Sequence, residues 1–128
     1  MRVLLDTHTF LWFITGDDRL PAKVRKIIDD PSCEKFVSLA SCWEIAIKFA
    51  RGRLELDITL EQLLNTAIEG NGLVLLDIER RHLLQITALA SVHGDPFDRL
   101  IVAQAKIEKL VQLSNDQTLD AYGINRVW

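Results

Sequence analysis

In RVLLDTHTFLWFIT, residues 2–15, a short apolar run ends at an acid and helical periodicity begins directly after it. The spacing predicts a strand, then Asp6, then a helix. A carboxylate at the end of a buried strand loses hydration, which destabilises the fold unless a charge or hydrogen bonds offset the loss. A helix N-terminus supplies part of that compensation, and a metal ion would supply the rest. Asp6 is therefore the first candidate functional residue.

Apolar runs and helical patterns alternate along the rest of the chain. The runs predicted as strands are residues 35–39, 73–77, 110–116 (a strand that continues into a loop) and 124–128. The patterns predicted as helices are residues 21–28, 40–52, 60–69 and 79–90, a long helix from Pro96, and a short helix at 117–123. Solidly apolar strands that alternate with helices are typical of a parallel sheet covered on both faces. We predict the α/β class, as a three-layer α/β/α sandwich with a central parallel sheet.

The composition bounds the class of protein. A chain of 128 residues with 48% hydrophobic and 26% charged residues predicts a single domain over residues 1–128. Too few apolar residues precede Asp6 to form the apolar core of a signal peptide. No apolar run approaches the roughly 20 residues of a membrane span. We expect a cytoplasmic protein with no membrane partner. Cys33 and Cys42 lack the spacing of a zinc site and predict reduced thiols.

The net charge of −3 argues against a protein that grips nucleic acid through a broadly basic surface. Acidic residues around a divalent cation nevertheless reverse the local sign of the field and can hold a phosphate. The chain has no glycine-rich nucleotide-binding motif.

Acids follow or open the elements that meet at one edge of such a sheet, where ligands of open α/β folds bind. Asp6 ends the first strand, Glu44 lies in the helix after the second, Asp98 opens the long helix of HGDPFDRLIVAQA, and Asp116 follows the penultimate strand. Clustered carboxylates repel one another, so divalent cations stabilise them. Oxygen ligands favour Mg²⁺ or Mn²⁺ over zinc.

Helix capping explains some of these residues equally well. Asp95 as N-cap, Pro96 as first helical residue and Asp98 in the first turn would account for both acids of the DPFD motif. The spacing Ser41-x-x-Glu44 is a capping-box pattern. From this spacing alone, helix capping and metal binding are about equally supported as the role of Glu44. Thr7 is equally a cap or a group that orients a carboxylate or water.

Four segments in this order, LLDTHTFLW, SLASCWEIAIKFARGRL, HGDPFDRLIVAQA and LSNDQTLDAYG, resemble the PIN-domain ribonucleases, and closely the VapC-type toxins of bacterial type II toxin–antitoxin pairs. The resemblance covers nearly the whole chain and implies the strand order 3-2-1-4-5. It implies an endoribonuclease dependent on Mg²⁺ or Mn²⁺ that leaves 5′-phosphate and 3′-hydroxyl ends. The four acids it implies as catalytic residues and metal ligands are Asp6, Glu44, Asp98 and Asp116, with Asp95 left as the helix cap.

The resemblance also implies partners, namely an RNA substrate, a small antitoxin and a second copy of the chain. Ser114 stands where the family has Thr or Ser before its fourth acid. Thr7 and Ser114 are candidate substrate-binding residues. Two interpretations of the basic residues are equally supported, contact with the RNA backbone and a solvated surface; these residues are Lys48, Arg51, Arg53 and Arg99.

Asp77 ends a strand in LVLLD just as Asp6 does in RVLLD. The implied strand order puts Asp77 at the far edge, roughly 10 Å from the first strand, so we expect a helix cap rather than a ligand. His8 and His93 do not repeat at a metal-ligand spacing and are expected near the site rather than in the chemistry.

The same residues also bear on three other functions. A phosphatase of the haloacid-dehalogenase kind needs a second Asp where His8 stands, and a receiver domain needs an acidic pair and a lysine that the chain lacks. The alternative that stays open is a catalytically weak PIN-like module that binds RNA or protein.

Overall fold

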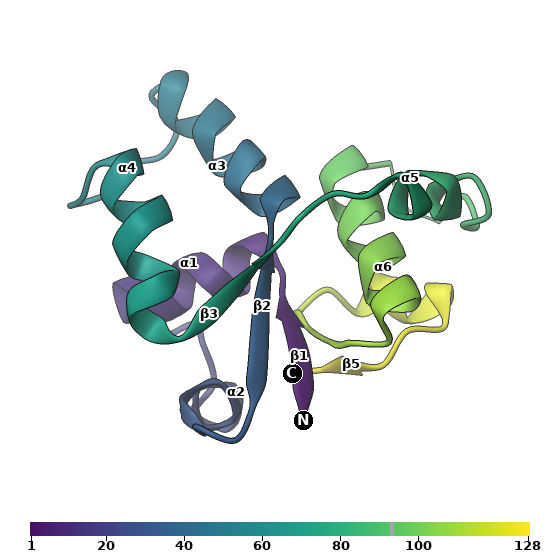
Figure 1. The fold of residues 1–128 in the computed structure, drawn as a ribbon, viewed down its shortest axis with the longest axis horizontal. Helices are drawn as coiled ribbons and strands as arrows, with labels where there is room; N and C mark the ends of the chain where they lie inside the picture. The colour runs from purple at the N-terminus through teal and green to yellow at the C-terminus, as the bar shows by residue number, and fades with distance from the viewer. Residues whose placement is uncertain (93) are drawn as a thin grey trace.

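Five short parallel strands form one sheet in residues 1–92 and 94–128, which the computed structural model describes (Figure 1). The strands are β1 (Arg2–Leu5), β2 (Glu34–Ser38), β3 (Leu73–Leu76), β4 (Val111–Leu113) and β5 (Arg126–Val127). Their order is β3-β2-β1-β4-β5, which confirms the order expected from the resemblance. The reversal of strand order falls between β1 and β4, the point where ligands of such sheets bind.

Helices connect the strands. They are α1 (Thr7–Thr15), α2 (Ala22–Asp29), α3 (Leu39–Ala50), α4 (Leu60–Gln62), α5 (Arg80–Ile86) and α6 (Pro96–Glu108), with a π-helical turn η1 (Leu63–Ala67) and 3₁₀ turns η2 (Glu69–Asn71) and η3 (Gln117–Tyr122). None of the helices in the described part of the chain is long and apolar enough to cross a membrane.

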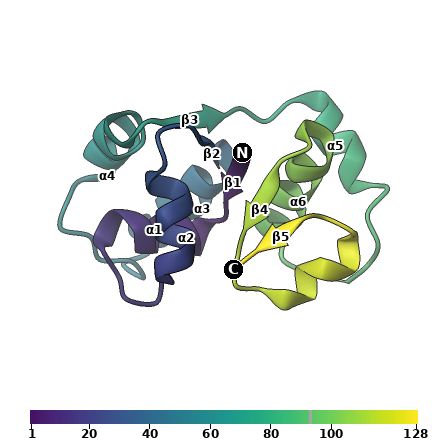
Figure 2. The ribbon, with the colours of Figure 1, turned by 90° about the horizontal axis from the view of Figure 1, so that it is seen from below.

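The two faces of the sheet carry separate hydrophobic clusters. Val3 and Leu5 of β1 are fully buried against residues of α1, α2 and α3, whereas Leu4 between them is fully buried against α6. Successive side chains of a strand point to opposite faces, so three adjacent apolar residues require cover on both. Figures 1 and 2 show α1 and α2 on one side of the sheet and α5 and α6 on the other. The three-layer prediction is confirmed.

Two predicted helices differ in detail. The helix predicted at 60–69 begins as α4 but continues as the π-helical turn η1. Leu63 and Ile68 are both buried, and the i→i+5 hydrogen bonds of a π-helix bring residues five apart toward the same face. The helix predicted at 79–90 ends at Ile86. The Thr87 hydroxyl donates to the carbonyl of Leu84 (2.7 Å), a local bond that competes with helix continuation.

Cys33 and Cys42 are free and buried, in agreement with the prediction of reduced thiols. Burial raises the pKa of the Cys42 thiol to about 11. The thiol is therefore protonated at neutral pH, which makes it a small apolar core residue rather than a nucleophile.

Candidate active site

The carboxyl ends of β1 and β4 lie level, because Leu5 pairs with Leu113 in the parallel register. Asp6, the next residue, donates its backbone N–H to the carbonyl of Leu113 (3.2 Å). Its Oδ1 accepts from the backbone N–H of Thr9 (2.9 Å), so Asp6 is the N-cap of α1. The residue is only 8% exposed. Strand end and helix start together hold this carboxylate in one orientation.

Asp95 is the N-cap of α6, as the sequence predicted. Asp95 Oδ1 accepts from the backbone N–H groups of Phe97 (2.8 Å) and Asp98 (3.1 Å), and Pro96 is the first helical residue. Asp98, one turn into the helix, is half-buried. His93, the first residue of the motif, lies outside the described residues.

Three of the predicted acids line one cavity of about 350 Å³. The lining residues are Asp6, His8, Asp98, Asn115, Asp116 and Leu119. The acids come from the end of β1, the first turn of α6 and the segment after β4, which are far apart in sequence. His8 was expected near the site and is there, whereas Asn115 carried no signal in the sequence beyond its place before Asp116.

Hydrogen bonds hold the segment after β4. The fully buried Ser114 accepts the backbone N–H of Asp116 at its Oγ (3.1 Å). Asp116 Oδ1 accepts from the backbone N–H (3.0 Å) and hydroxyl (2.6 Å) of Thr118 and so caps η3. Arg126 donates to the Ser114 carbonyl (3.0 Å). The same guanidinium hydrogen-bonds to the Asp120 carboxyl and holds its pKa below the usual value. Ser114 thus positions Asp116 through the backbone.

Glu44 is not a capping residue, so the capping-box interpretation is wrong. Ser38 is the N-cap of α3, with its Oγ accepting from the backbone N–H of Ala40 (3.0 Å), and Glu44 lies in the second helical turn. Its Oε2 pairs with Lys48 Nζ at 3.1 Å. Its Oε1 is buried and, within the described chain, has no hydrogen-bond partner. Glu44 lies outside the cavity lining, yet a buried, half-satisfied carboxylate is suited to one more cation.

Thr7 is not the cap of α1, since Asp6 has that role. The Thr7 hydroxyl donates to Ser41 Oγ (2.9 Å), and both side chains are buried. This bond ties the start of α1 to α3, the helices that carry Asp6 and Glu44.

The predicted RNA-contacting cations differ in surroundings. Lys48 pairs with Glu44, and Arg51 is exposed at the end of α3. Arg99 instead donates to the carbonyls of Ala90 (2.9 Å) and Ile86 (3.4 Å) and to the Tyr122 hydroxyl. Its guanidinium therefore ties α6 to the segment after α5, and its contact with RNA stays a prediction.

Asp77 follows β3, two strands from β1, as expected, but its predicted role as a helix cap is wrong. Glu79 is the N-cap of α5, and His82 Nδ1 accepts the Glu79 backbone N–H (3.0 Å). The N-cap therefore lies two residues later than predicted, at Glu79 instead of Asp77, because Glu79 and His82 form a capping box at the first turn.

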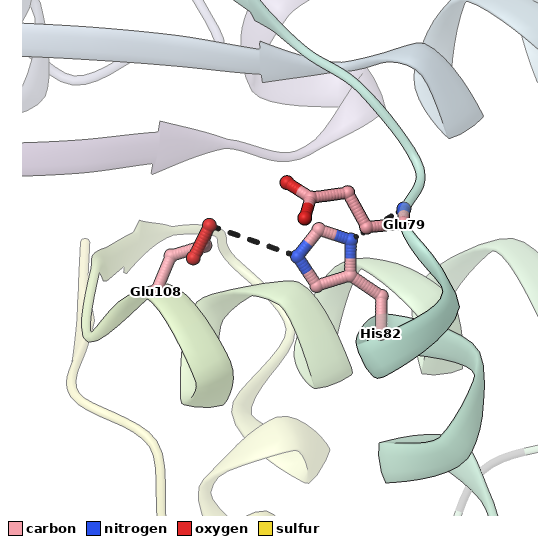
Figure 3. A group of neighbouring side chains, drawn as sticks. All are labelled: Glu79, His82 and Glu108. Atoms are coloured by element: carbon pink, nitrogen blue, oxygen red, sulfur yellow. Dashed lines mark hydrogen bonds and ion pairs between the residues drawn. The ribbon is translucent and has the colours of Figure 1, made fainter.

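Glu79, His82 and Glu108 form a separate group whose ligand atoms lie within 4.8 Å of one another (Figure 3). His82 Nδ1 accepts a hydrogen bond, so the neutral ring carries its proton on Nε2 and has no lone pair there for a metal. Arg81 already pairs with Glu79 (3.1 Å) and Glu108 (2.5 Å). Glu108 is also about 15 Å along α6 from Asp98. The group joins α5 to α6 and does not belong to the cavity.

Gln104 was missed by the sequence analysis. Although it is polar, it is fully buried in α6, where its Oε1 accepts from the Ser38 hydroxyl and its Nε2 donates to the Asp77 carbonyl (3.2 Å). Gln104 therefore connects α6 to the start of α3 and to the end of β3. The only signal for it was a glutamine inside the apolar run IVAQA.

The fold and cavity together define an α/β protein with an acidic pocket at the carboxyl edge of a doubly covered parallel sheet. The chain belongs to the PIN domain family, whose model matches residues 3–125. No curated protein matches the chain in sequence.

Solved structures share the fold, among them a toxin–antitoxin complex from Klebsiella pneumoniae, which is 16% identical with a TM-score of 0.68 and coverage of 98% of this chain and 96% of that one. VapBC2 from Rickettsia felis bound to a promoter DNA fragment is 12% identical, with a TM-score of 0.74 and coverage of 99% of this chain and 98% of that one. DNA-bound VapBC from Salmonella typhimurium is 19% identical, with a TM-score of 0.73 and coverage of 99% and 97%. FitAcB from Neisseria gonorrhoeae is 17% identical, with a TM-score of 0.67 and coverage of 98% and 96%.

Proposed function

We propose that this chain is a metal-dependent endoribonuclease that hydrolyses RNA phosphodiester bonds and is the toxin of a toxin–antitoxin pair. The observation that carries the proposal is the single cavity lined by Asp6, Asp98 and Asp116. Membership of the PIN domain family and the shared fold of the toxin–antitoxin structures support it.

The donor set fits Mg²⁺ or Mn²⁺. Asp6, Asp98 and Asp116 offer only carboxylate oxygens to the cavity, and Glu44 adds a buried oxygen without a hydrogen-bond partner in the described chain. These four residues would hold the ion. A bound divalent ion polarises a phosphate and lowers the pKa of an attacking water.

The chain's own groups prepare the site for a phosphate. The Thr9 N–H holds Asp6, and the Ser114 hydroxyl holds the backbone of Asp116, so both carboxylates are oriented before substrate arrives. Asp6 and Asp98 lie at the N-termini of α1 and α6, where the helix dipole favours an anionic ligand. Hydrolysis by water needs no side-chain nucleophile and is expected to leave 5′-phosphate and 3′-hydroxyl ends.

Metal-dependent cleavage tests the proposal directly. Purified protein is incubated with structured RNAs, including tRNA and ribosomal RNA, in Mg²⁺ or Mn²⁺ and in EDTA, and the products are resolved on denaturing gels. We expect cleavage with either ion and none in EDTA, because the carboxylates alone supply no Lewis acid. Cleavage that persists in EDTA would contradict the metal assignment.

The alternative is a catalytically weak PIN-like module that binds RNA or protein. It predicts binding without cleavage under every metal condition. Retention of all four acids, three of them in one cavity, favours the nuclease.

We further propose a small antitoxin partner and a homodimer. The similar VapBC structures are complexes, and exposed apolar side chains such as Leu83, Leu84 and Val74 offer area for protein contacts. Expression of the chain alone is expected to arrest growth, and co-expression with the adjacent open reading frame is expected to restore it. Normal growth with the chain alone, despite cleavage in vitro, would contradict the toxin role. Light scattering of the purified protein tests the dimer.

A further inference from the structure

A second hollow of about 530 Å³ lies beside the acidic cavity, between α1 and the segment that follows α3. The lining residues that bear on ligand binding are His8, Trp12, Asp17, Arg19, Lys48, Arg53 and Glu55. We call it the basic groove, because Arg19, Lys48 and Arg53 outnumber its two carboxylates in a chain whose net charge is −3.

The basic groove and the acidic cavity share a lining residue. His8 belongs to both, so the two hollows are neighbours, and a ligand long enough to occupy both would pass this side chain. Lys48 makes a second connection, since this residue lines the groove and its Nζ pairs with Glu44 Oε2 (3.1 Å). A chain with repeated negative charges that is cut at the acidic cavity would therefore find cations directly beside it.

The cations of the groove differ in what they can offer. Arg19 is held by a two-point contact with Asp17, 2.7 Å at the shortest, and this contact lowers the pKa of the Asp17 carboxyl to about 2. Its guanidinium lies 4.9 Å from the centre of the Trp12 ring, while the side chain remains 68% exposed. A fixed, exposed guanidinium plane is suited to stack on an unpaired base. Arg53 is exposed and supplies charge for a phosphate.

We propose that the basic groove binds the single-stranded segment of RNA on one side of the cleaved bond, with Lys48 and Arg53 at phosphates and Arg19 against a base. This inference rests on the proposed ribonuclease function and adds the path of the substrate. Arg51 and Arg99, equally eligible in the sequence, do not line the groove.

Binding without cleavage tests the path. In an Asp6→Asn background, fluorescence anisotropy measures the affinity for a labelled oligouridylate of about 8 nucleotides. Arg53→Glu is expected to weaken RNA binding by about 10-fold. Arg53→Ala is expected to reduce the steepness of the plot of log affinity against log salt concentration by about 1, because one phosphate contact is lost. The matched control is Arg80→Glu, which makes the same charge change at an exposed position on α5, across the sheet, and is expected to stay within about 2-fold of the parent.

Equal weakening by Arg53→Glu and Arg80→Glu would overturn the path, because only overall charge would then matter. A second outcome would also overturn the proposed RNA path. If Arg53→Glu weakens the binding of a labelled hexaglutamate peptide but not the binding of the RNA, the groove binds an acidic protein segment. Wild-type cleavage measured in parallel separates the two proposals. Cleavage with no groove effect removes the path alone, whereas a groove effect with no cleavage removes the nuclease and leaves an RNA-binding groove.

Discussion

Asp6→Asn is expected to reduce metal-dependent RNA cleavage by more than about 100-fold, since even residues that only support a metal ligand cost 10–100-fold. The substitution removes one negative charge from the cavity and leaves the shape of the side chain unchanged. Asparagine is as good an N-cap as aspartate, so its Oδ1 keeps the bond from the Thr9 N–H and the free energy of unfolding should change by less than about 1 kcal/mol. Cleavage assays and urea denaturation of the same preparation measure both effects.

Asp77→Asn is the matched control, because LVLLD and RVLLD place an acid at the same point of a strand. Asp77 is exposed, lies two strands from β1 and does not cap α5. Its contact with Gln104 uses the backbone carbonyl, which the substitution leaves in place. We expect cleavage within about 2-fold of wild type and stability within about 0.5 kcal/mol. Equal loss of activity in the two variants would contradict the assignment of the site to the β1 edge.

Gln104→Leu is expected to lower the free energy of unfolding by about 2–3 kcal/mol, because two polar groups lose a hydrogen bond to the buried amide at about 1–3 kcal/mol each. The groups are the buried Ser38 O–H, which loses its acceptor although Ser38 Oγ still accepts from the Ala40 N–H, and the partly buried Asp77 carbonyl. Leucine has a similar volume, so a cavity does not explain the loss. Equilibrium urea denaturation followed by tryptophan fluorescence measures the change.

Gln117→Leu makes the same chemical change at an exposed position, where we expect an effect within about 0.5 kcal/mol. A loss at Gln104 no larger than at Gln117 would show that the buried amide contributes nothing net. A larger loss at Gln104 would show that its bonds to Ser38 and Asp77 stabilise the packing of α6 on the sheet.

Much of the site followed from local sequence pattern. The run RVLLDTHTFLWFIT predicted β1, Asp6 and α1 in the observed order, and the DPFD motif predicted Asp95 as cap and Asp98 one turn into α6. Each of these features depends on groups a few residues apart, such as a cap oxygen and the N–H groups two or three positions on. The alternation of buried strands with helices likewise determined the α/β class.

Tertiary structure distinguishes alternatives that the local sequence pattern supports equally. RVLLD and LVLLD are interchangeable in sequence, and only the strand order, which the family resemblance implied, separates Asp6 from Asp77. The cap of α3 is Ser38 rather than Ser41, and Gln104 is buried because Ser38 and Asp77 meet it from other elements. The physical reason is that caps and periodicity arise within one turn or one strand. By contrast, the neighbour of a strand and the partner of a buried amide are set by how the helical connections pack on the sheet.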